Sequence, residues 1–375
     1  MTTPTAPQAT PYAPPAANAY TPTTPLDGAR LEAFLHRVVG DWGGALGTVM
    51  GLVGDRLGLY RAMADAGPLL PAEVAERSGT AERYVREWLM NQAAGGYVDY
   101  EPATGRYTLP PEHAAALLQT DAPYYVAGGF ELVAATTRSE PRLEANFRTG
   151  EGMFWGEHDP SLFSGTERFF RPGYAAHLVS EWIPALDGVR EKLERGARVA
   201  DVGCGHGAST VLLAEAYPDS RFVGFDFHGP SVEHARHAAA QAGVADRSTF
   251  VQAGVTDFPG RDYDLIAFFD CYHDLGDPVG AARHAYEALA PDGTLMLVEP
   301  MAGERIEDNL HPVGRVFTGA SVLVCTPNAL ASGPGPVLGT QATEAALRGA
   351  VTAGGFTRFR RVAATPFNRV FEARR

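Results

Sequence analysis

The sequence predicts a doubly wound, mainly parallel α/β domain that follows a smaller, mainly helical domain. Three observations support this prediction. The second half of the chain alternates short apolar stretches, typical of buried strands, with segments of helical periodicity. A glycine-rich loop joins the first of these strands to the first helix. The chain of 375 residues is also longer than one ordinary core, which indicates about two domains.

Composition and periodicity divide the chain into four segments. Residues 1–26 are rich in Pro, Thr and Ala and are expected to form a disordered tail. Residues 27–120 are expected to form the helical domain, residues 121–195 a helical connector, and residues 196–375 the α/β domain. The connector is rich in aromatic residues, which either pack between the domains or line an apolar substrate pocket.

The formal net charge of −13 argues against several partners. An acidic surface repels nucleic-acid phosphates and anionic membranes. The three cysteines are far apart and show no CxxC spacing, which indicates reduced thiols and a cytoplasmic location. No apolar run approaches the roughly 18 residues of a membrane span, and the first residues do not resemble a signal peptide.

The helical domain contains a winged-helix pattern. Apolar residues recur at helical spacing from Leu31 to Met63, with breaks expected at the glycines. Residues 70–90 predict two helices joined by a turn at Gly79, and residues 97–109 predict a hairpin. Such a module either places its second helix in a DNA groove or provides a scaffold for dimerisation.

The charge of this module favours dimerisation. Between Glu73 and Glu112 there are four arginines and seven acidic residues, a net charge of −3. That charge is unsuitable for a phosphate-binding face, so we expect no nucleic-acid partner. A transcriptional regulator with a ligand-sensing second domain remains the alternative.

The α/β domain alternates strands and helices along its length. The predicted strands are 199–202, 222–226, 249–253, 265–269, 294–299, 357–362 and 367–372, and the predicted helices are 208–217, 231–241, 278–290 and 343–353. The last two strands have no room for a crossover helix, so they should form an antiparallel hairpin at one edge. The segment between residues 299 and 343 is expected to be a loop-rich insertion.

The loop after the first strand predicts a cofactor site. Glycines at Gly203, Gly205 and Gly207 permit positive φ and let a ligand approach the backbone. Asp226 ends the next strand, where a carboxylate accepts ribose hydroxyls. Together they indicate an adenosine-containing cofactor. The glycines alone also fit a dinucleotide fingerprint, which leaves a nicotinamide-dependent oxidoreductase open.

Two features favour a different cofactor. Asp201 precedes the loop, where a carboxylate suits a ligand with an amino group and a sulfonium better than a pyrophosphate. Residues 289–299 resemble the turn and fifth strand of class I S-adenosylmethionine-dependent methyltransferases. With these motifs in order, about nine-tenths of the chain resembles plant-type small-molecule O-methyltransferases with an N-terminal winged-helix dimerisation domain, and a related bacterial natural-product subfamily.

The resemblance implies a Rossmann-like class I methyltransferase sheet, S-adenosylmethionine as cofactor, a small-molecule acceptor and a homodimer formed through the N-terminal domain. It assigns these cofactor contacts: Asp201 and Gly203 by the methionine part, Cys204 within the binding loop, Gly205 near the ribose, Asp226 on its hydroxyls, Phe227 on the adenine, and Asp270 near the methionyl amine. Family members often have a carboxylate near Gly254 for the adenine amine. In this sequence, either Asp257 or a backbone group must accept the hydrogen bond from the adenine amine.

The resemblance also implies a general base. His273, followed by Asp274, matches the histidine that deprotonates a hydroxyl acceptor, and Glu299 matches the acid that orients it. The family has a second acidic partner of the histidine, but Leu338 and Gly339 occupy the matching positions here. Asp308 is the candidate substitute. In the alternative, His273 has a structural role, and the enzyme methylates a nitrogen or carbon atom only by holding the acceptor close to the cofactor.

Four further histidines, His206, His228, His234 and His237, raise the question of a metal. No cysteine or carboxylate in the sequence completes the spacing of a metal site. We therefore expect solvated surface histidines and no metal.

Overall fold

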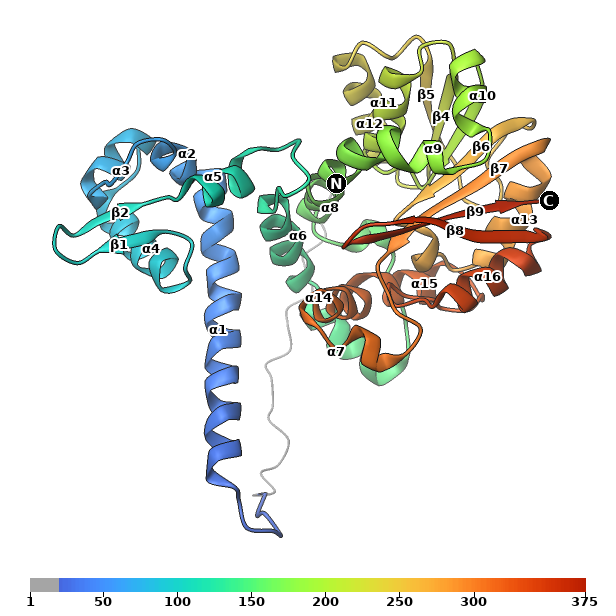
Figure 1. The fold of residues 1–375 in the computed structure, drawn as a ribbon. Coiled ribbons are helices and arrows are strands. Elements are labelled where there is room, and N and C mark those ends of the chain that lie inside the picture. The colour runs from blue at the N-terminus through green and yellow to red at the C-terminus, as the bar shows by residue number, and fades with distance from the viewer. Residues whose placement is uncertain (1–19) are drawn as a thin grey trace, which may run out of the picture.

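The structure is a computed structural model that describes residues 20–375 (Figure 1). Most of the predicted disordered tail, residues 1–19, lies outside the described residues. A long first helix and a small module stand at one side of the chain, and the α/β domain stands at the other (Figure 1). Across residues 20–375, no helix is both long enough and apolar enough to cross a membrane.

The first helix, α1 (Gly28–Arg56), is uninterrupted. The Asp27 carboxylate caps it by accepting hydrogen bonds from the backbone N–H groups of residues 29 and 30. The predicted break is confirmed at Gly58, but the breaks expected at the glycines inside α1 are wrong, because each of them costs a helix only about 1 kcal/mol and does not forbid it. The helix ends where Gly58 takes a φ of +68°. Figure 1 shows the first part of α1 extending away from the rest of the protein.

The predicted helix–turn–helix and hairpin are confirmed. They consist of α2 (Leu59–Met63), α3 (Pro71–Ser78), α4 (Glu82–Ala94), β1 (Asp99–Glu101), β2 (Arg106–Thr108) and α5 (Pro111–Leu118). Gly79 turns the chain between α3 and α4 with a φ of +66°. Val74, Val85 and Leu89 are fully buried where these helices meet, which gives the module its own core.

The connector is helical, as predicted. It contains α6 (Ala127–Thr137), α7 (Glu140–Thr149), η1 (Trp155–Glu157), α8 (Ser161–His177), η2 (Leu178–Trp182), α9 (Ile183–Ala185) and α10 (Val189–Arg195). Helices α6 and α8 touch through their backbones. A Cβ on Gly128 would lie 2.5 Å from the Arg168 carbonyl, and one on Gly165 would lie 2.7 Å from the Leu132 nitrogen. This close packing fixes α8 relative to the helical module.

The sheet of the α/β domain has seven strands in the order β5-β4-β3-β6-β7-β9-β8. Its strands are β3 (Arg198–Val202), β4 (Arg221–Asp226), β5 (Ser248–Gln252), β6 (Tyr263–Phe269), β7 (Leu289–Pro300), β8 (Arg358–Ala364) and β9 (Asn368–Arg374). The first five are parallel, and β9 runs antiparallel to both β7 and β8. The doubly wound sheet with a C-terminal hairpin at one edge is therefore confirmed.

Helices cover both faces of the sheet, because successive residues of a strand point to opposite sides. In β6, Leu265 and Ala267 belong to one buried cluster, together with α10, α11 (Ala208–Ala216) and α12 (Gly229–Gln241). Ile266 and Phe268 belong to the other cluster, with α13 (Pro278–Ala288) and α16 (Glu344–Ala353). The central strands β3, β6 and β7 are buried on both faces, as a doubly wound sheet requires.

The prediction of a loop-rich insertion is wrong over Pro312–Ser332. After η3 (Tyr272–Asp274) and η4 (Ile306–Asn309), this stretch forms α14 (Pro312–Ala320), η5 (Ser321–Cys325) and α15 (Thr326–Ser332). Pro312 and Pro327 stand in the first turns of α14 and α15, where proline starts a helix rather than breaking it. The connector is tied to this insertion, since the backbone N–H of Met153 donates to the Pro327 carbonyl.

Candidate active site

A pocket lies at the carboxyl ends of the parallel strands, where the strand order reverses between β3 and β6. It contains about 970 Å³ of space, including its open mouth, which is in the range of small-molecule sites. The loop after β3, the ends of β4 and β6, and α8 supply most of its walls.

The glycines of the loop are needed for its shape. Gly203, Gly205 and Gly207 have φ values of +75°, +52° and +82°. A Cβ on Gly203 would lie 2.6 Å from the Cys271 sulfur, and one on Gly207 would lie 2.9 Å from the Phe250 ring. Neighbouring atoms exclude side chains at Gly203 and Gly207, and the positive φ disfavours one at Gly205, so the backbone itself forms the pocket wall. Gly203, Cys204 and Gly205 all line the pocket.

The Asp226 carboxylate is held rigidly at the end of β4. Its Oδ2 accepts a 2.8 Å hydrogen bond from the Gly205 nitrogen, and its Oδ1 accepts one of 2.8 Å from the His228 nitrogen. Burial raises the pKa of Asp226, and the two backbone bonds oppose that increase. Asp226 lines the pocket beside Phe227, whose ring is 44% exposed. This pairing offers an acceptor and a flat apolar face in the same place.

Asp201 lies behind the pocket wall. Its Oδ2 accepts hydrogen bonds of 2.6 Å from both the Ser209 and Thr210 hydroxyls. Its Oδ1 is buried and finds no hydrogen-bond partner among residues 20–375. Burial raises the pKa of Asp201 to about 6. Ser209 lines the pocket while Asp201 does not, so any effect of Asp201 on a ligand passes through this serine or the loop.

Asp270 follows β6 and lines the pocket. Its backbone has a φ of +49°, which aspartate tolerates better than most residues. Its carboxylate accepts a 2.6 Å bond from the Tyr174 hydroxyl and bonds of 2.8 and 3.0 Å from the Asn368 amide. Burial raises the pKa of Asp270 to about 8. Sequence reasoning missed both partners, which lie on α8 and β9.

The structure brings His273 and Glu299 together. His273 Nδ1 lies 2.8 Å from Glu299 Oε2, and Glu299 Oε1 accepts a 3.0 Å bond from the Tyr272 nitrogen. Both side chains are almost fully buried. Burial alone would lower the pKa of His273, but the Glu299 carboxylate raises it well above its usual value. His273 sits just behind Asp274, which lines the pocket and whose pKa burial raises to about 7.

The segment that replaces the family's second acidic partner lies beside His273. The Gly339 nitrogen donates a 2.9 Å bond to the His273 carbonyl, so residues 338–339 do lie beside the histidine. The Cys325 sulfur lies within 4.8 Å of a ring nitrogen of His273 and was missed by sequence reasoning. Asp308 hydrogen-bonds instead to the Arg305 nitrogen within η4.

The remaining predicted contact is Gly254, which follows β5. A Cβ there would lie 2.7 Å from the Asp257 carboxylate, so this acid packs directly on the glycine. The next residue, Val255, lines the pocket. Asp257 as the partner of the adenine amine stays a prediction.

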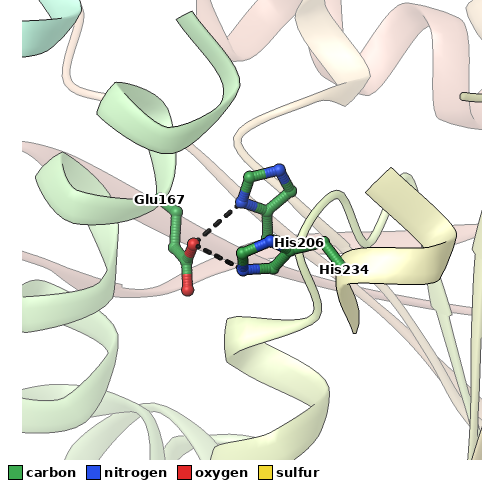
Figure 2. A group of neighbouring side chains, drawn as sticks. All are labelled: Glu167, His206 and His234. Atoms are coloured by element: carbon green, nitrogen blue, oxygen red, sulfur yellow. Dashed lines mark hydrogen bonds and ion pairs between the residues drawn. The ribbon is translucent and has the colours of Figure 1, made fainter. Parts of the chain in front are cut away.

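Three side chains meet at the pocket rim (Figure 2). Glu167 of α8 lies beside the stacked rings of His206 of the glycine loop and His234 of α12, and one of its carboxylate oxygens faces both rings (Figure 2). Glu167 and His206 also line the pocket. The expectation of solvated surface histidines is wrong for His206, whose side chain is only 11% exposed. Glu167 is the carboxylate that the sequence did not reveal.

Comparison with known proteins agrees with this architecture. The family model described as the Rv2258c-like winged HTH domain matches residues 44–119, and the model described as a methyltransferase domain matches residues 193–327. The chain therefore has a winged helix-turn-helix domain followed by a methyltransferase domain.

Two curated relatives that match about a third of the chain are methyltransferases. A 27-O-demethylrifamycin SV methyltransferase of Amycolatopsis mediterranei is 32% identical over 107 residues, which are 28% of this chain and 39% of the relative. A trans-aconitate 2-methyltransferase of Streptomyces avermitilis is 33% identical over 131 residues, which are 34% of this chain and 48% of the relative. The chain thus spans less than half the length of these relatives.

Solved structures extend the likeness to both domains. Mitomycin 7-O-methyltransferase has a TM-score of 0.69 at 22% identity, with 93% of this chain and 100% of that chain covered. Human N-acetylserotonin methyltransferase has a TM-score of 0.67 at 19% identity, with 93% of this chain and 98% of that chain covered. These likenesses establish the fold, which is that of the class I methyltransferases with an N-terminal winged-helix domain.

Proposed function

We propose that this protein is an S-adenosylmethionine-dependent methyltransferase that acts on a small-molecule acceptor. The observation that carries the proposal is the Asp226 carboxylate, fixed by two backbone N–H groups and facing a pocket beside the glycine loop. The methyltransferase names of the curated relatives support it. So does the human structural neighbour, N-acetylserotonin methyltransferase, whose structure is a complex with SAM.

The residues present fit this cofactor. Asp226, Asp270 and Asp274 line the pocket, and the unpartnered Oδ1 of Asp201 lies just behind it. Within the part of the chain that the structure describes, no lysine or arginine lines this pocket. Burial raises the pKa of these pocket carboxyls, and a cofactor with an ammonium and a sulfonium favours their charged form on binding, whereas the pyrophosphate of a dinucleotide finds no cation there. The charge of the pocket therefore disfavours the nicotinamide alternative.

Each residue has a separate task in this proposal. Asp226 accepts both ribose hydroxyls, and Phe227 packs on the adenine. Asp270, with Asp201 acting through Ser209, attracts the methionyl ammonium. The bound cofactor supplies an electrophilic methyl group on its sulfonium, and the chain aligns an acceptor in line with it. The backbone of Gly203, Cys204 and Gly205 forms the floor, and the assignment of Gly254 near the adenine is retained.

The walls of the pocket favour an aromatic or otherwise apolar acceptor. Aromatic side chains contribute much of its lining, namely Trp155, Phe163, Phe170, Tyr174 and Phe269. Such rings bind flat apolar molecules with little loss of conformational freedom. Some relatives carry the names of natural-product enzymes, which supports an acceptor from secondary metabolism.

We further propose that His273 is the general base for a hydroxyl acceptor. Glu299 holds the Nδ1–H, so the other nitrogen, Nε2, which lies on the side of Cys325 and Asp274, is the one that would take the acceptor proton. In the alternative, His273 only supports the pocket wall, and proximity drives an N- or C-methylation. His273→Gln separates the two, because glutamine still donates to Glu299 but is not basic. We expect affinity for S-adenosylhomocysteine to persist while turnover of phenolic acceptors is lost; unchanged turnover would remove the base role.

A homodimer through the N-terminal domain is also proposed. Large apolar residues on α1 are 45–67% exposed and alternate at spacings of four and three, namely Leu35, Val39, Trp42, Leu46 and Val49. That spacing is the one by which two helices pack along a common seam. A second copy of this chain carries the same row of exposed apolar residues on α1, so we propose that the two α1 helices pack against each other in the dimer.

The regulator alternative is disfavoured by α4, which would have to enter a DNA groove. Arg83 pairs with Glu87, and Arg86 pairs with Glu82 on the same helix. These arginines are already neutralised, and the helix offers phosphates no net positive charge. No nucleic-acid partner is proposed. The three free thiols support the cytoplasmic location, which stays a prediction.

A further inference from the structure

The group of Glu167, His206 and His234 joins three segments that are distant in the sequence (Figure 2). Glu167 Oε2 lies 2.8 Å from His206 Nδ1 and 3.5 Å from His234 Nε2. The two imidazole rings are nearly parallel, with centroids 3.9 Å apart. Each histidine therefore turns one ring nitrogen toward the same carboxylate oxygen.

This geometry is close to that of a zinc ligand set. Zinc binds histidine nitrogen and carboxylate oxygen at about 2.0–2.2 Å, so tetrahedral ligand atoms lie about 3.4 Å from one another. The two distances from Glu167 Oε2 bracket that value, and one atom from each of the three residues lies within 4.8 Å of the others. Binding requires Glu167 to shift outward from His206 and one of the two stacked imidazoles to turn, so that both ring planes pass through the metal.

The surroundings leave a route for the metal. The side chain of His234 is 49% exposed and that of Glu167 is 23% exposed, whereas His206 is nearly buried. Three protein ligands leave a fourth position for water, as in open zinc sites. The group is separate from His273, and its position at the rim is independent of which cofactor the pocket holds.

We propose that Glu167, His206 and His234 form a binding site for a divalent transition metal of the zinc class. The bound metal ties α8 of the connector to the glycine loop and to α12. The three segments are distant in the sequence, so the bound metal would hold them together at the rim of the pocket.

Cobalt provides a direct probe of the site. The untagged full-length protein is treated with a chelator, dialysed and titrated with Co²⁺, and Zn²⁺ is then added as competitor. We expect one equivalent of Co²⁺ per chain to give the visible absorption of a low-coordinate nitrogen and oxygen site, and Zn²⁺ to displace it. We also expect the unfolding temperature to rise with Zn²⁺.

Variants then assign the site. Glu167→Gln and His234→Gln remove one ligand each on partly exposed side chains, and each should weaken Co²⁺ binding by at least about tenfold. His237→Gln is the matched control, because His237 lies one turn further along α12 and contacts Gln241 instead. It should bind Co²⁺ like the wild type. Melting curves of the three variants verify that they are folded.

Three results would overturn the proposal. The first is the absence of Co²⁺ binding at millimolar concentration, which would leave only a hydrogen-bonded group. The second is equal Co²⁺ affinity in the wild type and in the Glu167 and His234 variants. The third is a cobalt–thiolate charge-transfer band, which would locate the metal at the buried group of His273, Asp274 and Cys325.

Discussion

The pairing of His273 with Glu299 makes a sharp prediction for Glu299→Gln. In the wild type, Glu299 Oε1 accepts from the Tyr272 nitrogen and Oε2 accepts from His273 Nδ1. In the variant, the amide oxygen must stay on the Tyr272 nitrogen, so the amide NH₂ group turns toward His273. That group donates to Nδ1, and the neutral imidazole is forced to carry its proton on Nε2.

The magnitude follows from the loss of a charged partner. A hydrogen bond to a charged group contributes about 1.5–3 kcal/mol, and about 1.4 kcal/mol corresponds to one pKa unit. Burial continues to disfavour the imidazolium when the carboxylate is gone. We therefore expect the variant to lower the pKa of His273 by at least about one to two pH units, from a value above the ordinary histidine range.

The assay needs no acceptor. The protein is labelled with ¹⁵N-histidine, and the ring nitrogens are followed by long-range proton–nitrogen correlation between pH 5 and 9. The signal of His273 is assigned by its loss in His273→Gln. The wild type should show a proton on Nδ1 at high pH, and Glu299→Gln should show it on Nε2.

Cys325→Ala is the matched control, because it removes the neighbour of His273 that is not a carboxylate. It should leave the tautomer unchanged and lower the pKa of His273 less than Glu299→Gln does. The reasoning is refuted if Glu299→Gln leaves the pKa within about half a unit and the tautomer unchanged, provided that both variants melt cooperatively.

Three further predictions concern the cofactor, pH and the dimer. Asp226→Ala should weaken S-adenosylhomocysteine binding about 150-fold or more in calorimetry, since two charge-assisted bonds of about 1.5–3 kcal/mol each are lost, and a change below threefold would contradict this. Burial raises the pKa of Asp270 to about 8 and that of Asp274 to about 7, so both favour the folded state most below pH 4. The unfolding temperature of the ligand-free protein should fall from pH 5 to 8.5, and it should fall less steeply in Asp270→Asn. An unfolding temperature that rises over this range would contradict the raised pKa values of Asp270 and Asp274. Trp42→Glu combined with Leu46→Glu should halve the mass measured by light scattering, and an unchanged mass would remove α1 from the interface.

The sheet was predictable from the sequence because its signals are local. Each strand is a short apolar run, and each glycine of the loop takes the positive φ that only glycine adopts easily. The pairing of His273 with Glu299 was also within reach. His273 follows β6 and Glu299 lies near the end of the neighbouring parallel strand β7, and the carboxyl ends of such strands meet at one edge of a sheet.

Contacts between distant segments were not predictable in the same way. Tyr174 and Asn368 lie almost a hundred residues from Asp270, and Glu167 lies 39 residues from His206. No periodicity connects such positions, since α8 and β9 reach the pocket only through packing. Asp201 shows a further limit of prediction from sequence. A motif identifies the cofactor-binding loop, but it does not show which side chains near the loop face the ligand.

The two wrong helical predictions have a common cause. Glycines within α1 were expected to break the helix, and residues 299–343 were expected to be rich in loops although proline stands in the first turns of α14 and α15. Glycine has only a modest cost inside a long helix, and proline is favoured in the first turn. Their position within a helix decides their effect, and a single sequence does not reveal that position in advance.

The central claim is that the acidic pocket above the glycine loop binds a methyl donor rather than a dinucleotide. Calorimetry of the wild-type protein with S-adenosylhomocysteine and with NAD⁺, under the same buffer and salt, tests it most directly. The account predicts saturable heat with one S-adenosylhomocysteine per chain and none with NAD⁺. Binding of NAD⁺ without binding of S-adenosylhomocysteine would contradict it.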